Sequence, residues 1–216
     1  MKKLIVFDLD GTLVDSIGGI AESVNRTREK YNFRRLPEAE IMTYVGDGAR
    51  KLLIRSFADV EMPVSVDEAL QTMIDFYAAD PLYNTALYPG VRDGLQKLSD
   101  AGWILTVVSN KPQLVSEKIL SGLGVMPLLA ENIGGGGNFP LKPDPAAMLY
   151  LLEKYGAEPA ESFVVGDNHT DLDSAVNAGM KSVFCRYGFG EKRTSRADRE
   201  VVSFDELTEF LIHNGE

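Results

Sequence analysis

Four short apolar runs constrain the fold more than any other feature of this sequence. They are apolar at nearly every position instead of at alternate positions, which is typical of strands covered on both faces. Between them, apolar residues recur at helical spacing, for example from Met148 to Tyr155. Strands alternating with helices predict an α/β fold built on a parallel sheet. The predicted strands are Leu4–Phe7, Trp103–Val108, Phe163–Val165 and Ser182–Cys185, with Leu128–Ile133 as a further candidate.

The segment between the first two predicted strands, from about residue 15 to residue 82, shows only helical patterns. Its clearest apolar stripe runs from Val66 to Tyr77. An ordinary crossover between parallel strands uses about one helix. The segment therefore predicts a small helical bundle inserted after the first strand, and extra helices layered on the sheet are the alternative that the stripes leave open.

The composition excludes several classes of partner and site. Lys and Arg number 22 and Asp and Glu 32, which gives a net charge of −10. Such a surface repels phosphate backbones, so we expect no nucleic-acid partner. No apolar run is long enough to span a bilayer, and the run after the first lysines stops at Asp8, too early for a signal peptide. Cys185 is the only cysteine, so we expect no intrachain disulfide. Together with the short apolar runs, this predicts no membrane partner and a cytoplasmic location.

The glycine run Gly134–Gly137 is expected to be a flexible connection, because such a run disfavours both strand and helix interiors. A phosphate cradle is the other interpretation. The run lacks the Lys-Ser/Thr ending of a P-loop, which favours the plain connection.

Polar residues follow the predicted strands at the points where those strands end. The carboxyl ends of parallel strands share one edge of a sheet, and ligands bind in the crevice there. Residues far apart in the sequence are therefore predicted to converge in space. These residues are Asp8 and Asp10, Ser109 and Asn110, Lys142 before Pro143 at the expected first turn of a helix, and Asp167 with Asp171.

The chemistry of this set favours phosphoryl transfer. Several carboxylates in one pocket repel each other, and a hard divalent cation such as Mg²⁺ relieves that repulsion. Asp8 and Asp167 are the side chains that we expect to hold it, with the backbone carbonyl of Asp10 as a third ligand. Lys142, the Ser109 hydroxyl and the Asn110 amide would neutralise phosphoryl oxygens. Either Asp8 or Asp10 would be the nucleophile, and the other carboxylate the general acid and base.

Each of these clusters also has an ordinary structural interpretation. Asp8–Gly11 resembles a turn, Asp167 and Asp171 fit an N-cap followed by a solvated helix face, and Lys142-Pro143 fits a surface turn. Together, however, these interpretations require four strand-edge or helix-start sites to be polar by coincidence.

In their order and spacing, these residues resemble the four motifs of the haloacid dehalogenase superfamily. The resemblance covers nearly the whole chain, and it implies a Rossmann-like core (1–15 plus 83–216) with an inserted helical cap (16–82), joined through Ser16–Gly19 and Ala79–Thr85. It also implies a set of roles. Asp8 is the nucleophile and Asp10 the general acid and base; Asp8, Asp10 and Asp167 bind magnesium with Asp171 in support; and Ser109, Asn110 and Lys142 bind the phosphoryl group.

Within that superfamily, Asp10 favours phosphate esters, because members that cleave other bonds lack this second aspartate. The chain is similar to phosphoglycolate phosphatases at Asp15-Ser16, at Val45–Gly48 with Arg50, and at Tyr88–Val91. We therefore expect a phosphatase that hydrolyses a small phosphorylated metabolite through an aspartyl-phosphate, as a monomer or homodimer. A sugar-phosphate mutase or pyrophosphatase is the alternative within the fold, and a phospho-aspartate signalling module is the alternative of another class.

Overall fold

A parallel sheet forms the centre of the molecule, which is described by a computed structural model of residues 2–213. Within these residues the main sheet has the strand order β5-β4-β1-β6-β7-β8, and each neighbouring pair is parallel. The first strand of the chain is central, so the strands that follow it fill one side and then the other. The strands are β1 (Leu4–Phe7), β4 (Ile104–Pro112), β5 (Glu131–Gly135), β6 (Phe163–Gly166), β7 (Lys181–Cys185) and β8 (Arg199–Val201).

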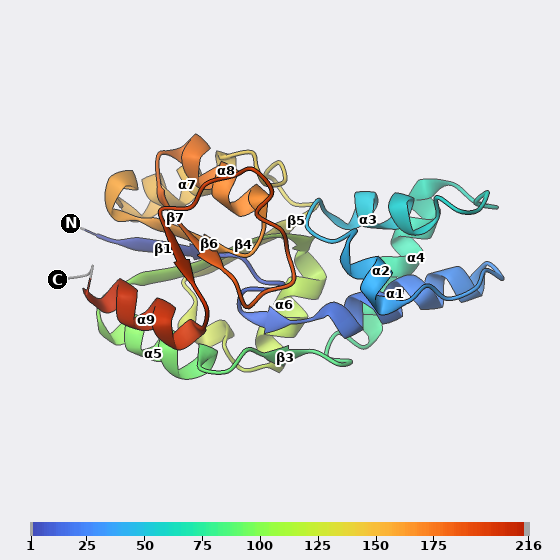
Figure 1. Cartoon of the computed structure of the whole chain (residues 1–216), viewed down its shortest axis with the longest axis horizontal. Helices are drawn as coiled ribbons and strands as arrows, with labels where there is room; N and C mark the ends of the chain where they lie inside the picture. The colour runs from blue at the N-terminus through green and yellow to red at the C-terminus, as the bar shows by residue number, and fades with distance from the viewer. Residues whose placement is uncertain (1, 214–216) are drawn as a thin grey trace.

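Helices cover both faces of this sheet, which explains why the strands are apolar throughout (Figure 1). Ile5 and Phe7 of β1 pack into one apolar cluster with α5, α6 and α9, whereas Leu4 and Val6 pack into a second cluster with α7 and α8. The predicted α/β fold is therefore confirmed. The helices are α5 (Val91–Asp100), α6 (Gln113–Gly122), α7 (Ala146–Tyr155), α8 (His169–Ala178) and α9 (Phe204–His213); short 3-10 turns are Met126–Leu128 and Pro159–Glu161.

A group of four helices extends from one end of the sheet, on the right in Figure 1. They are α1 (Ile17–Lys30), α2 (Glu38–Met42), α3 (Ala49–Ser56) and α4 (Val66–Ala79). A short antiparallel pair, β2 (Val14–Asp15) and β3 (Ala86–Leu87), ties the outgoing and returning chain together at their base. We call residues 16–82 the helical insert, and the division into separate core and cap domains stays a prediction.

The glycine run departs from its expected form. The prediction of a flexible connection is wrong for Gly134 and Gly135, because both lie in β5. A Cβ atom on Gly134 would lie 2.5 Å from Cα of Gln113, and one on Gly135 would lie 2.8 Å from the carbonyl oxygen of Asn110. Glycine is thus needed here because β5 approaches the end of β4 too closely for a side chain.

Two helices begin at other positions than the sequence predicts. Helix α1 begins at Ile17, so the expected connecting segment Ser16–Gly19 is wrong. This helix carries glycine at position 19 because a Cβ there would lie 2.9 Å from the carbonyl oxygen of Tyr83 in the returning chain. Helix α7 begins at Ala146, after Asp144 accepts a hydrogen bond from the Ala146 amide at 2.9 Å, so Lys142 precedes the helix instead of opening it.

Candidate active site

Asp8 stands at the carboxyl end of the central strand. Its amide donates to the carbonyl oxygen of Val165 at 2.8 Å, so β1 stays attached to β6 up to this residue. The chain then turns through Gly11, whose φ of +78° favours glycine. A Cβ on Gly11 would lie 1.8 Å from Oδ2 of Asp167. The turn after Asp8 is therefore pressed directly against the carboxylate that ends the neighbouring strand.

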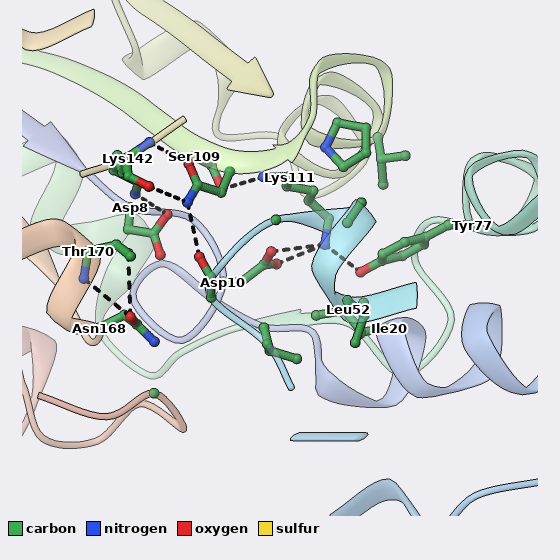
Figure 2. A pocket seen from close by; sticks show the side chains of 18 of the residues that line it. Asp8, Asp10, Ile20, Leu52, Tyr77, Ser109, Lys111, Lys142, Asn168 and Thr170 are labelled. Carbon is green, nitrogen blue, oxygen red and sulfur yellow. Dashed lines mark hydrogen bonds and ion pairs between the residues drawn. The ribbon is translucent and has the colours of Figure 1, made fainter. Parts of the chain in front are cut away.

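Lys142 supplies a buried positive charge at one end of the site (Figure 2). Its Nζ donates to Oδ1 of Asp8 at 2.7 Å, to Oδ1 of Asp171 at 2.6 Å and to the carbonyl oxygen of Val108 at 2.6 Å. Burial alone would lower the pKa of Lys142, but Asp171 and Asp8 raise it, so the side chain stays an ammonium.

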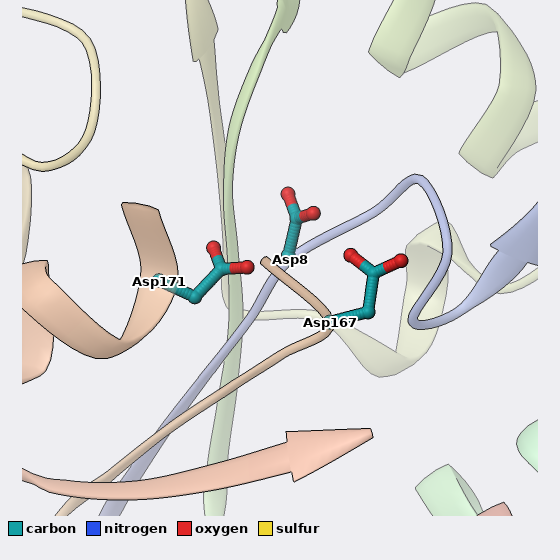
Figure 3. Close-up of side chains that lie close together, drawn as sticks. All are labelled: Asp8, Asp167 and Asp171. Atoms are coloured by element: carbon teal, nitrogen blue, oxygen red, sulfur yellow. The ribbon is translucent and has the colours of Figure 1, made fainter. Parts of the chain in front are cut away.

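Three buried carboxylates, those of Asp8, Asp167 and Asp171, meet at this end (Figure 3). One oxygen from each lies within 4.8 Å of the others. Burial raises the pKa of Asp8 to about 7, against the attraction of Lys142 and with added repulsion from Asp171 and Asp10. Burial and then repulsion from Asp8 and Asp171 raise the pKa of Asp167. This all-oxygen set with excess negative charge fits a hard divalent cation.

Asp171 also shapes the start of helix α8. Its Oδ2 accepts a hydrogen bond from the Asn168 amide at 3.0 Å, while the Asn168 side chain accepts one from the Thr170 amide at 3.3 Å. This reciprocal pair is a capping box. The sequence interpretation of Asp167 and Asp171 as an N-cap followed by a solvated helix face is therefore wrong, because Asn168 is the N-cap and Asp171 is buried. The other oxygen of the Asp171 carboxylate accepts from Lys142.

Asn110 holds the backbone that carries Lys142. Its Oδ1 accepts from the Lys142 amide at 2.8 Å, and its Nδ2 donates to the Lys142 carbonyl oxygen at 3.1 Å. The same Nδ2 donates to the carbonyl oxygen of Gly46 in the helical insert at 3.0 Å. Ser109 lies beside it, and its hydroxyl accepts from the Lys111 amide at 3.3 Å. The structure thus brings together all the site residues named from the sequence, whereas their catalytic roles stay predictions.

Lys111 is a site residue that the sequence analysis missed. Its buried Nζ donates to Oδ1 and Oδ2 of Asp10 at 2.9 and 3.1 Å and to the Tyr77 hydroxyl at 2.7 Å (Figure 2). Ser16 donates to the same Asp10 carboxylate. Burial lowers the pKa of Lys111, but Asp10 and Tyr77 outweigh that effect and raise it above its usual value. The available signal was its place directly after Ser109-Asn110, close to the end of a predicted strand.

One cavity connects these groups, between the sheet edge and the helical insert. It measures about 750 Å³, counted to its open mouth. Among its described lining residues, Lys111 and Lys142 are the two with a positively charged side chain. Apolar side chains from both parts of the chain form much of the remaining wall: Ile20, Leu52, Met73, Ile74 and Val115.

Comparisons with known proteins bear directly on this arrangement. Residues 5–185 match the family model described as haloacid dehalogenase-like hydrolase. The chain belongs to the haloacid dehalogenase-like hydrolases. The superfamily inferred from the four motifs is thereby confirmed, and so is the expectation that the chain is an enzyme with a Rossmann-like parallel sheet.

Several haloacid dehalogenase-like relatives match along nearly their whole length. The phosphoglycolate phosphatase of Haemophilus influenzae is 34% identical over 217 residues, covering 97% of this chain and 96% of the relative. That of Rhodospirillum rubrum is 35% identical over 199 residues, covering 89% and 83%. The crystal structure of a predicted phosphoglycolate phosphatase from Haemophilus somnus superposes with a TM-score of 0.89 at 31% identity, covering 97% of each chain. In residues 2–213 of this hydrolase, every helix is too short or too polar to cross a bilayer.

Proposed function

We propose that this chain is a magnesium-dependent phosphatase that hydrolyses a small phosphorylated metabolite, with phosphoglycolate as its substrate. The observation that carries this proposal is the position of the Asp8 carboxylate, which lies among Lys142, Asp167 and Asp171 at the base of the cavity. The names of the full-length relatives support the choice of substrate. We place the enzyme in the cytoplasm, as a monomer or homodimer.

Asp8 is the proposed nucleophile. One of its oxygens forms a bond to phosphorus while the bond from phosphorus to the substrate oxygen breaks, which leaves an aspartyl-phosphate. Lys142, already within hydrogen-bond distance of Asp8, would neutralise the phosphoryl oxygens, and the Ser109 hydroxyl and Asn110 amide would donate to them. These groups are held in place before substrate arrives, because β1, β4 and the segment before α7 fix their backbones.

The metal site would be formed by Asp8, Asp167 and the backbone carbonyl of Asp10, with Asp171 supporting it. A bound Mg²⁺ supplies positive charge that allows the carboxylates and the phosphoryl group to approach each other. Asp167 is oriented for this role by the amide of Gly190, which donates to its Oδ2 at 2.7 Å. A Cβ on Gly188 would lie 2.4 Å from the same oxygen. The loop after β7 therefore leaves room for the Asp167 carboxylate only because residue 188 is glycine.

Asp10 is the proposed general acid and base. It would give a proton to the departing substrate oxygen and then take one from the water that attacks the aspartyl-phosphate. That second step releases inorganic phosphate and restores Asp8. The helical insert, as a cap, would cover the cavity and exclude bulk water during both steps.

The test is release of inorganic phosphate from a panel of metabolites with and without Mg²⁺. The panel contains phosphoglycolate, sugar phosphates, a nucleotide and pyrophosphate. We expect release from phosphoglycolate to be fastest and to stop when EDTA removes the metal. Interconversion of sugar-phosphate isomers without phosphate release would contradict the proposal and indicate a mutase. A lasting phospho-aspartate without turnover would also contradict it and indicate a signalling module.

A further inference from the structure

The side chain of Lys111 is a buried cation that the proposed chemistry at Asp8 does not use. This side chain is 3% exposed. It makes two contacts to the carboxylate of Asp10 and one to the hydroxyl of Tyr77, which belongs to α4 of the helical insert. A buried ammonium needs a compensating anion, because leaving it unpaired away from water is costly. Asp10 provides that anion in this structure.

Both oxygens of the Asp10 carboxylate accept hydrogen bonds in this arrangement. Lys111 contacts both of its oxygens, and Ser16 donates to Oδ1 as well. The proposed role of Asp10, however, is to exchange a proton with the oxygen that leaves the phosphorus next to Asp8. To make that contact, Asp10 has to give up at least part of its pairing with Lys111. Another anion then has to replace it.

The cavity offers the substrate direct access to Lys111. Lys111, Tyr77, Asp8 and Lys142 all line the same space. With the phosphoryl group at Lys142, the remaining positively charged side chain among the described lining residues is Lys111. Much of the remaining wall is apolar, including Val115 and Met73, so a second anionic group of a bound substrate would find its partner at Lys111.

We propose that Lys111, together with the Tyr77 hydroxyl, binds the carboxylate of the substrate in exchange for the carboxylate of Asp10. This inference rests on the proposed function. The exchange replaces one carboxylate by another, so the buried ammonium keeps a counter-ion of the same charge and shape throughout. A substrate without an anionic group cannot make this exchange, so releasing Asp10 then leaves the buried ammonium without a counter-ion, which is costly. Lys111 is thus a specificity-determining residue, since a substrate with an anion at this end releases Asp10 more readily than one without.

The experiment compares two substrates that differ at this group alone, phosphoglycolate and 2-hydroxyethyl phosphate, which carries a hydroxymethyl group in place of the carboxylate. The wild-type enzyme with Mg²⁺ is expected to prefer phosphoglycolate in kcat/KM by at least about tenfold. Lys111→Met is expected to lose roughly 10- to 100-fold more activity toward phosphoglycolate than toward 2-hydroxyethyl phosphate, the range typical for a lost charge-assisted hydrogen bond.

Two further variants keep the test informative. Lys118→Met is the control, because Lys118 of α6, like Lys111 of β4, donates to α4, here to the Ala78 carbonyl oxygen at 2.7 Å, and is absent from the cavity lining. It is expected to leave the ratio of the two substrates unchanged. Tyr77→Phe removes one hydroxyl while Lys111 keeps its partner Asp10, so it serves if Lys111→Met fails to fold. It is expected to lower the preference for phosphoglycolate by a few-fold.

The outcomes separate this inference from the proposed function. If the wild-type enzyme releases phosphate from neither substrate, the proposed function is wrong. If the wild-type enzyme hydrolyses phosphoglycolate and folded Lys111→Met loses activity equally toward both substrates, the proposed function stands and the inference is overturned. A Tyr77→Phe enzyme with an unchanged substrate ratio, where Lys111→Met does not fold, also overturns it.

Discussion

Lys111 and Lys142 are both buried in the cavity wall and both pair with aspartates, but their partners belong to different parts of the molecule. Lys142 pairs with Asp8, which follows β1, and with Asp171 of α8. Its third acceptor is the Val108 carbonyl oxygen in β4. Lys111 pairs with Asp10 and with Tyr77, which comes from the helical insert. The contacts of the Lys142 ammonium therefore lie at the sheet edge and in α8, whereas those of the Lys111 ammonium also depend on where the insert lies.

This difference assigns separate functions, chemistry and substrate selection, to the two ends of the cavity. The Lys142 end, whose ammonium contacts only the sheet edge and α8 among the described residues, suits chemistry, which needs a geometry that does not change with the substrate. The end shared with the insert suits selection, because a ligand there contacts both parts of the chain at once. The following predictions test this contrast between a fixed end and a shared end.

Asp8→Asn should produce the largest effect. The amide is nearly the same size as the carboxylate but is a far poorer nucleophile, so turnover should fall by about 10⁴-fold or more. The measurement is phosphate release from p-nitrophenyl phosphate with Mg²⁺, alongside circular dichroism to confirm the fold. If this variant keeps most of its activity, Asp8 is not the nucleophile and the Lys142 end is not the chemical end.

Asp10→Asn should have the next largest effect, with a different kinetic form. Loss of a general acid and base lowers rates by about 10²- to 10⁴-fold. Nitrophenolate leaves readily without a proton, so the first step should survive better than the attack of water. Stopped-flow absorbance should therefore show a burst of nitrophenolate followed by slow turnover. A uniformly slow reaction without a burst speaks against a role for Asp10 in the second step.

Lys142→Met should destabilise the fold more than Lys111→Met does. The first change leaves two buried carboxylates without their cation, at a cost of about 3–5 kcal/mol. The second leaves one carboxylate, Asp10, which still accepts a hydrogen bond from Ser16. Urea unfolding of both variants without metal gives the comparison. Equal midpoints for the two variants contradict the proposed difference between the ends.

Metal binding should depend on pH at the Lys142 end. Burial raises the pKa of Asp8 from 3.8 to about 7 in the metal-free chain. Between these values the folded state holds a proton that the unfolded state has released, so this group's contribution to stability is present at low pH and is lost as pH rises through about 7. Mg²⁺ needs the ionised carboxylate. Its addition should therefore raise the melting temperature by a few degrees at pH 8 and by less at pH 6.

Asp167→Asn is the matched control for this effect, because it removes one carboxylate of the same buried group. Its melting temperature should respond little to Mg²⁺ at either pH. A wild-type shift that is equal at both pH values contradicts the assignment of Asp8 to the metal.

The sequence was sufficient for the parts of the molecule that depend on strand order. Continuous apolarity located β1 and β6 closely, because residues of alternate orientation are all buried between helices. The convergence of Asp8 and Asp167 followed from one rule about the ends of parallel strands. These contacts depend on topology, and topology is readable from the order of strands and helices.

The parts that sequence reasoning missed depend on contacts between elements. The stripe of α4 marked Tyr77 as apolar-facing, but periodicity does not reveal that the hydroxyl meets Lys111 across the cavity. Gly19 and Gly134 were interpreted as loop residues, although each is glycine because another segment passes too close for a side chain. Such close approaches are invisible until both segments have been placed.

The carboxylates that meet beside Lys142 are spread from Asp8 to Asp171 along the chain. As the protein is synthesised from its N-terminus, Asp8 leaves the ribosome early, whereas the capping carboxylate of α8 leaves after the helical insert and most of the sheet. The proposed nucleophile therefore stays inert throughout most of translation. Phosphatase activity in a nascent-chain series should appear abruptly, once α8 has emerged and docked.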